Sequence, residues 1–92
     1  MQSIHLVLLP GLDGTGLLFR PLLEVLPNNI KPIIVSYPSD KILGYDELLP
    51  IVLEHLPKDT PFVLLGESFS GPIALKVATT KPNTIIGLVL CA

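Results

Sequence analysis

Four short and almost continuously apolar runs constrain the fold of this chain more than any other feature of its sequence. They lie at residues 4–9, 33–37, 62–65 and 85–91 and consist mainly of Leu, Ile and Val. Runs of this length and character are typical of strands that are buried on both faces of a parallel sheet. Because parallel strands need long crossover connections, we expect each intervening segment to carry a helix that covers the strands.

The three intervening segments have the residue spacing of amphipathic helices. The first is predicted to be helical around residues 18–26, with Pro21 near its start. The second is predicted to begin at a cap formed by Asp46 and to hold Pro50 near its first turn. The third is predicted over residues 69–80. The apolar face of the second helix consists of Leu48, Ile51, Val52 and Leu56.

Strands that alternate with helices predict an α/β fold. We expect three layers, α/β/α, with a parallel sheet of about four strands and three crossover helices. Crossover connections are right-handed almost without exception, which places the helices on predictable faces of the sheet. The 92 residues suit one domain, residues 1–92. Their composition, 49% hydrophobic and 15% charged, favours a packed core over a disordered segment.

Charge and composition argue against several classes of partner. The formal net charge of -2 and the lack of any Lys/Arg cluster predict no nucleic-acid binding. No apolar stretch approaches the roughly 20 residues that span a bilayer, and the first residues lack the cationic region of a signal peptide. The single cysteine, Cys91, cannot form an internal disulfide and is expected to be a small buried hydrophobe. We therefore expect a cytoplasmic protein that uses no metal and no cofactor.

The residues Gly-Glu-Ser-Phe-Ser-Gly join the third predicted strand to the third predicted helix. A serine in this setting is expected on a sharp, strained turn that exposes its hydroxyl, and small residues are needed two positions to either side. Gly66 and Ser70 meet that need around Ser68, and Gly71 can relieve crowding because Ser70 replaces the more usual glycine. The backbone N–H of Phe69, at the start of the helix, is predicted to face any negative charge that forms near the serine.

A second loop, residues 9–16, follows the first predicted strand and is rich in glycine. Gly11, Gly14 and Gly16 allow its backbone to approach a substrate closely. If the first and third strands are neighbours, both loops leave the same edge of the sheet, where open α/β sheets bind ligands. The N–H of Leu12 is then the expected second donor of an oxyanion hole.

Together these loops resemble those of the α/β-hydrolase family, and the resemblance covers nearly the whole chain. The stretch LLGESFSGP, preceded by LPGLDGTG, is similar to bacterial esterase-type members. The resemblance implies acyl transfer, in which Ser68 attacks the carbonyl of a small acyl ester or thioester while a histidine takes its proton and an acid orients the histidine. In that family the acid and the histidine follow the serine by a long interval. We therefore expect the chain, which ends at Ala92, to be the amino-terminal part of such a domain and catalytically incomplete by itself.

The histidines and acids of the chain have weaker claims to a role in catalysis. His5 and His55 both precede Ser68, so chain order argues against either as the general base. Asp13 is expected in a turn or cap of the glycine loop, although it could contact substrate. Glu67 either tunes the electrostatics of the site or has a purely structural role.

Two other interpretations remain open. A small nucleotide-binding domain would use the glycines of residues 11–16 as a phosphate cradle, but their spacing is not G-x-G-x-x-G and the P-loop Lys is absent. A non-catalytic, split hydrolase would act by association. The uncharged run at residues 85–91 predicts an apolar edge strand with unpaired backbone groups, which invites self-association.

Overall fold

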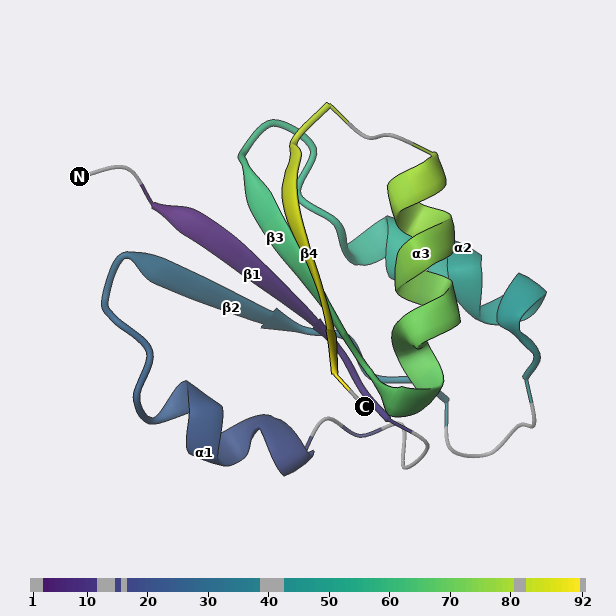
Figure 1. The fold of residues 1–92 in the computed structure, drawn as a ribbon, viewed down its shortest axis with the longest axis horizontal. Coiled ribbons are helices and arrows are strands. Elements are labelled where there is room, and N and C mark those ends of the chain that lie inside the picture. The colour runs from purple at the N-terminus through teal and green to yellow at the C-terminus, as the bar shows by residue number, and fades with distance from the viewer. Residues whose placement is uncertain (1–2, 12–14, 16, 39–42, 81–82, 92) are drawn as a thin grey trace.

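The described part of the chain, residues 3–11, 15, 17–38, 43–80 and 83–91 of a computed structural model, forms a three-layer α/β/α fold around one parallel sheet (Figure 1). All three strand pairs are parallel, in the order β2-β1-β3-β4. The predicted fold class is therefore confirmed. The strands are β1 (Ile4–Leu9), β2 (Ile30–Ile34), β3 (Phe62–Glu67) and β4 (Ile85–Cys91).

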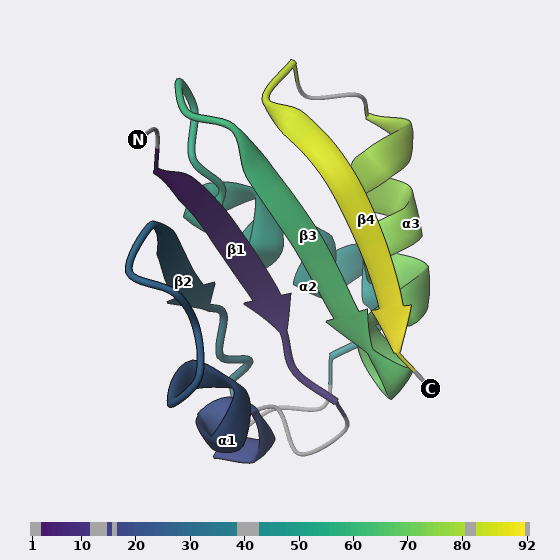
Figure 2. The ribbon, with the colours of Figure 1, turned by 60° about the vertical axis from the view of Figure 1, so that its left-hand side comes forward.

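Helices connect successive strands and lie on both sides of the sheet (Figure 2). The segments α2 and α3 cover one face, whereas α1 lies on the other side near β2. Two single turns of 3-10 helix precede α1 and α3. In chain order the helical segments are η1 (Leu17–Phe19), α1 (Arg20–Leu23), α2 (Tyr45–His55), η2 (Ser68–Ser70) and α3 (Gly71–Thr79).

The core fills the space between the sheet and the α2/α3 layer. Alternate residues of the two central strands point into it, because successive side chains of a strand face opposite sides. Full burial of one such aliphatic or aromatic side chain stabilises the fold by about 1.5–3 kcal/mol. The strands contribute Val7, Leu9, Phe62 and Leu64, and the helices contribute Leu48, Val52, Ile73, Ala74 and Val77.

The strand predictions were right for β1 and β4 and shifted for the other two. The second strand runs three residues earlier than predicted, because residues 30–34 pair in register with residues 4–8 of β1. It includes Pro32, which an edge strand tolerates since its outward side needs no hydrogen-bond donor. The third strand continues to Glu67, two residues beyond the predicted end.

The first predicted helix is much shorter than its apolar spacing indicated. Helical residues occupy only 17–23, with Pro21 in the first turn of α1 as predicted. Val25, which falls within the predicted helix, is 75% exposed, and α1 has no fully buried residue. Since short helices depend on tertiary packing for most of their stability, the sparse packing of this one accounts for its length.

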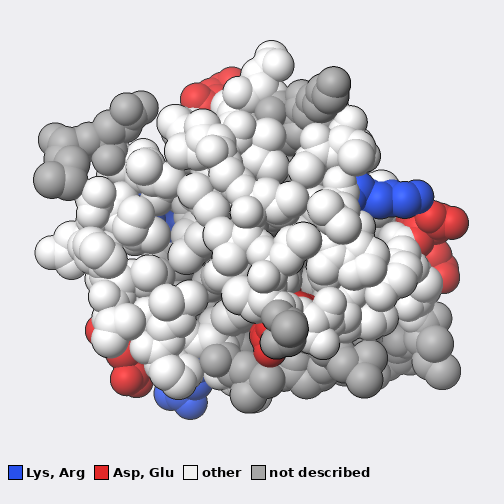
Figure 3. Space-filling view, viewed as in Figure 1, with Lys and Arg blue, Asp and Glu red and all other residues white. Residues whose placement is uncertain are grey.

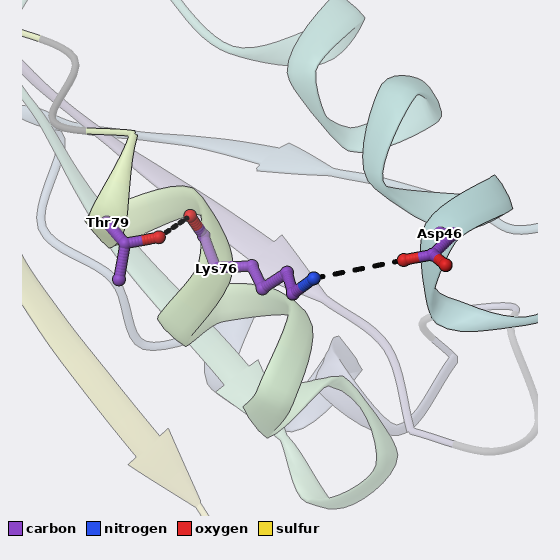
Figure 4. A network of polar contacts seen from close by, with 3 residues as sticks. All are labelled: Asp46, Lys76 and Thr79. Atoms are coloured by element: carbon purple, nitrogen blue, oxygen red, sulfur yellow. Dashed lines mark hydrogen bonds and ion pairs between the residues drawn. The ribbon is translucent and has the colours of Figure 1, made fainter.

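The second helix begins differently from the prediction. Its N-cap is Gly44 rather than Asp46, and the Glu47 carboxylate accepts a hydrogen bond from the Gly44 N–H at 3.1 Å. Asp46 lies in the first turn and pairs instead with Lys76 of α3, with 3.8 Å between Oδ1 and Nζ (Figure 4). Both side chains are largely exposed, so this link between the helices contributes little to stability.

The outer strand β4 departs from the expectation that helices cover every strand. Its side chains Ile86, Val89 and Leu90 are 57%, 42% and 50% exposed. Cys91, predicted to be buried, is exposed as well. Most of the face over β4 is uncharged in Figure 3. The outer edge of the sheet is thus open and apolar.

We expect Pro50→Ala to stabilise the protein. Pro50 lies in the second turn of α2, just after the first turn near which it was predicted, and is exposed. A proline there has no N–H to donate to the carbonyl of residue 46, and the alanine variant regains that hydrogen bond. The unfolded alanine variant also has more chain entropy, which offsets part of the gain. The net effect should be a free energy of unfolding about 2 kcal/mol higher than that of the parent. Urea denaturation measures this. Pro72→Ala is the control, because Pro72 is the second residue of α3, a position where proline is well tolerated. A Pro50→Ala protein no more stable than the parent would contradict the prediction.

Candidate functional site

The two loops that the sequence singled out leave the same edge of the sheet. Strands β1 and β3 are parallel neighbours, and Leu9 is in register with Gly66. The carboxyl ends of both strands therefore lie side by side, where their arrowheads point in Figure 2. The condition on which the predicted site depended, that the first and third strands are adjacent, is met.

The chain turns sharply from strand to helix at Ser68. Its φ of 46° lies in the left-handed region, and no other non-glycine residue in the described ranges has a positive φ. Glu67 before it is still extended, and Ser70 after it is already helical. Such a backbone conformation costs about 1–3 kcal/mol and persists only where the surroundings enforce it. The turn leaves Ser68 exposed at the end of β3.

Close packing of α3 on β3 enforces this turn. A Cβ added to Gly66 would lie 2.9 Å from the Ala74 Cβ and 2.9 Å from the Ser70 carbonyl oxygen. Only glycine fits there without moving the helix. Gly71, by contrast, has no atom within 4 Å of such a Cβ, so the structure gives no steric reason for a glycine at that position.

Ser70 does more than supply a small side chain. It is completely buried, and its hydroxyl donates a hydrogen bond to the carbonyl of Pro10, at the start of the glycine loop. The Tyr37 hydroxyl lies 2.5 Å from the Ser70 Oγ. One buried and one partly buried hydrogen bond therefore join three segments that are distant in sequence.

Tyr37 was missed as a member of the site by the sequence analysis, which placed it at the end of the second strand. The strand ends at Ile34, and Tyr37 lies beyond it, partly buried among the core residues. Burial raises the pKa of its hydroxyl above the usual 10.0. The group is thus protonated, and able to donate, throughout the neutral pH range. The sequence signal that could have identified Tyr37 is its position at the carboxyl end of the second predicted strand. Parallel strands end at one edge of the sheet, so this end lies at the same edge as Ser68.

An aromatic cluster surrounds the residue that follows the serine. The rings of Tyr37 and Phe69 meet edge to face, with centroids 6.4 Å apart. Tyr45 stacks on Phe69 at 5.1 Å from the start of α2. As the second residue of the helical segment that begins at Ser68, Phe69 has a backbone N–H without an acceptor inside the helix.

The glycine loop approaches the serine turn at Gly11. This residue is buried, and a Cβ added to it would lie 3.5 Å from the Cδ and from the Oε1 of Glu67. Glu67 therefore packs against the loop backbone, and its half-buried carboxylate is part of the site's surroundings. Several predicted residues of this region fall outside the described residues. They are Leu12, Asp13, Gly14 and Gly16.

The two histidines lie away from this edge of the sheet. His5 is near the amino end of β1, and its Nδ1 lies 3.1 Å from the Thr60 Oγ1. His55 ends α2 and donates from Nδ1 to the Ile51 carbonyl at 2.7 Å. Among the described residues, no three His, Cys, Asp or Glu side chains gather to hold a metal ion.

No helix in the described ranges combines the length and the apolar character needed to cross a membrane.

No protein-family model matches the chain, and no solved structure matches it. The chain is 35% identical, over 98 residues and 94% of its length, to a segment of the polyketide synthase ThaQ of Burkholderia thailandensis. It spans 5% of the length of that curated relative. The similarity concerns a short segment of a far longer protein and does not identify a reaction.

We expect Gly66→Ala and Gly71→Ala to have opposite effects on stability. The first forces a methyl group against a helix backbone and a neighbouring Cβ, which should lower the free energy of unfolding by about 2 kcal/mol. The second adds the same methyl group in open space at a helical φ of -54°, so it should be neutral or stabilise by up to about 1 kcal/mol. Urea denaturation of the pair measures both. Equal effects would show that the close approach of α3 to β3 is not required.

Proposed function

We propose that the chain carries the nucleophile part of an α/β-hydrolase site, in which Ser68 attacks the carbonyl carbon of a small acyl ester or thioester. The observation that carries the proposal is the left-handed turn at Ser68, at the strand end next to Gly11. A serine that caps an ordinary helix needs no positive φ, whereas an exposed nucleophile on a tight turn does. The resemblance of both loops to those of α/β-hydrolases supports the same interpretation.

The proposed chemistry is acyl transfer through a covalent intermediate. The Ser68 oxygen forms a bond to the carbonyl carbon, the leaving group departs, and water then releases the acyl group. Negative charge on the carbonyl oxygen is stabilised by the N–H groups of Phe69 and Leu12, helped by the positive end of the helix dipole. The resemblance assigns removal of the serine proton to a histidine that follows the serine in the chain. Neither His5 nor His55 has that place.

The similarity to part of a polyketide synthase favours an enzymatic role over a purely structural one, because that relative is itself an enzyme. It supports neither an ester nor a thioester in particular. Localisation in the cytoplasm belongs to the proposal as well, since the one cysteine is free and suits a reducing compartment. Nothing in the described residues favours the nucleotide-binding alternative.

Covalent labelling tests the nucleophile directly. We expect a fluorophosphonate probe to label the protein once, at Ser68, and slowly because neither His5 nor His55 lies at this edge of the sheet. Added imidazole should accelerate labelling, since it supplies a proton acceptor. Intact-mass spectrometry and peptide mapping measure the extent and the site.

Two variants control the labelling experiment. Ser68→Ala should abolish labelling with and without imidazole. Ser36→Ala removes another exposed serine, outside the turn, and should leave the labelling rate unchanged. Labelling that survives in Ser68→Ala, or that never occurs in the folded parent protein, would contradict the proposed nucleophile.

A second candidate function is association through the β4 edge. Strand β4 contains no charged residue, and its large apolar side chains are exposed. Natural edge strands are normally protected by charges, proline or a covering segment, and this one has none of the first two. A chain with such an edge is suited to pair with a further strand, including that of a second copy.

We expect the protein to associate at increasing concentration and Ile86→Lys to weaken that association. A lysine on an exposed edge strand opposes strand pairing by charge repulsion and by solvation of its ammonium group. Sedimentation velocity over a concentration series measures the effect. Leu75→Lys makes a similar change at an exposed leucine on α3 and should leave association unchanged. A parent protein that stays monomeric, or equal effects of the two lysines, would contradict pairing through β4.

A further inference from the structure

We propose that Tyr37 and Ser70 are positioning residues that hold the glycine loop against the serine turn. This inference rests on the proposed acyl-transfer function and goes further, because it assigns a role to two hydroxyl groups that do not touch the substrate. The chain of contacts runs from the Tyr37 hydroxyl to the Ser70 Oγ and on to the Pro10 carbonyl.

The direction of both hydrogen bonds follows from the supply of protons. A serine hydroxyl has one proton, and Ser70 gives it to the Pro10 carbonyl, which can only accept. Tyr37 must therefore donate its own proton to Ser70. Its raised pKa keeps that proton in place at neutral pH. We call these two hydrogen bonds, from Tyr37 to Ser70 and from Ser70 to Pro10, the tie. Both bonds donate in the same direction along the tie, and both hydroxyl groups are needed to complete it.

Burial makes this tie a specific one. Ser70 and Pro10 are both fully buried, so water cannot replace either partner. A glycine at position 70 would satisfy the space requirement of the turn but would leave the Pro10 carbonyl without its donor. Because a buried polar group without a partner is costly, the structure favours the one loop position in which Pro10 meets Ser70. The serine in place of the more usual glycine therefore has a physical role.

Tyr37 also touches the other side of the proposed site. Its ring meets the edge of the Phe69 ring, and the N–H of Phe69 is the proposed oxyanion donor. The Tyr37 side chain thus contacts Phe69 directly and is connected to Pro10 through the Ser70 hydroxyl. A displacement of about 1 Å at a reacting centre can slow a reaction by up to about 100-fold, so a residue that sets this spacing can affect rate without touching substrate.

The test uses variants that remove one hydroxyl at a time. Tyr37→Phe, Ser70→Ala and Ser70→Gly each break the tie, and each should slow fluorophosphonate labelling of Ser68 about tenfold. Tyr45→Phe is the matched control. It removes the hydroxyl of a tyrosine on the same aromatic cluster that makes no hydrogen bond among the described residues, and it should label at the parent rate. The second-order rate constant is measured at a temperature where circular dichroism shows every variant to be folded.

Three results would overturn the inference. Unchanged labelling rates with lowered unfolding temperatures would make the two hydroxyl groups purely structural. Parent-like labelling of Ser70→Gly, with slow labelling of Ser70→Ala, would mean that side-chain size matters and the hydroxyl does not. Additive losses in the Tyr37→Phe/Ser70→Ala double variant would show that the two groups act separately, since members of one chain lose their effect together.

A second readout separates this inference from the proposed function. If the parent protein does not label at all, the nucleophile proposal fails, and the amide chemical shift of Gly11 decides on the tie. A larger Gly11 shift in Tyr37→Phe than in Tyr45→Phe would support the hydrogen-bonded connection from Tyr37 to the loop. Equal or absent shifts would overturn it.

Discussion

The close approach of α3 to β3 is the constraint on which the candidate site depends. It is possible because Gly66 has no side chain and Ala74 has a small one, so helix and strand meet with no room for a further carbon. The chain has to reverse from extended to helical within a few residues, and Ser68 takes the left-handed conformation that this requires. The packing contributes the energy that offsets the local strain, and the exposed position of the serine follows from it.

The same packing brings together segments that have no relation in sequence. Because β1 and β3 are neighbours, the first residues after β1 lie beside the turn, where Ser70 can reach Pro10 and Glu67 can cover Gly11. Tyr37 comes to this place from the end of β2 on the far side of β1. The site is therefore built from three strand ends, and hydrogen bonds from the Tyr37 and Ser70 hydroxyl groups connect them.

Helices cover the central strands of the sheet, whereas its β4 edge is open. Core residues of β1 and β3 pack under α2 and α3, whereas β4 presents apolar side chains to its surroundings. This asymmetry links the two candidate functions, because the strand that would carry an association lies next to the strand that positions the serine. A partner bound to β4 would extend the sheet without covering the end of β3, so association and acyl transfer are compatible.

The sequence by itself determined the features that depend on neighbours along the chain. Alternating strands and helices, the bounds of β1 and β4, and the sharp turn at Ser68 followed from apolar runs and from one motif, because the residue spacing of strands and helices and the small residues that such a turn requires are visible along the chain. Only the tertiary structure decided how far β2 and α1 extend, that Cys91 is exposed, and that the Tyr37 and Ser70 hydroxyl groups form a partly buried hydrogen bond. Those features depend on which distant segments are in contact, on the register that pairs residues 30–34 with β1, and on how closely the short helix α1 is packed. The spacing of residues along the chain contains none of this information.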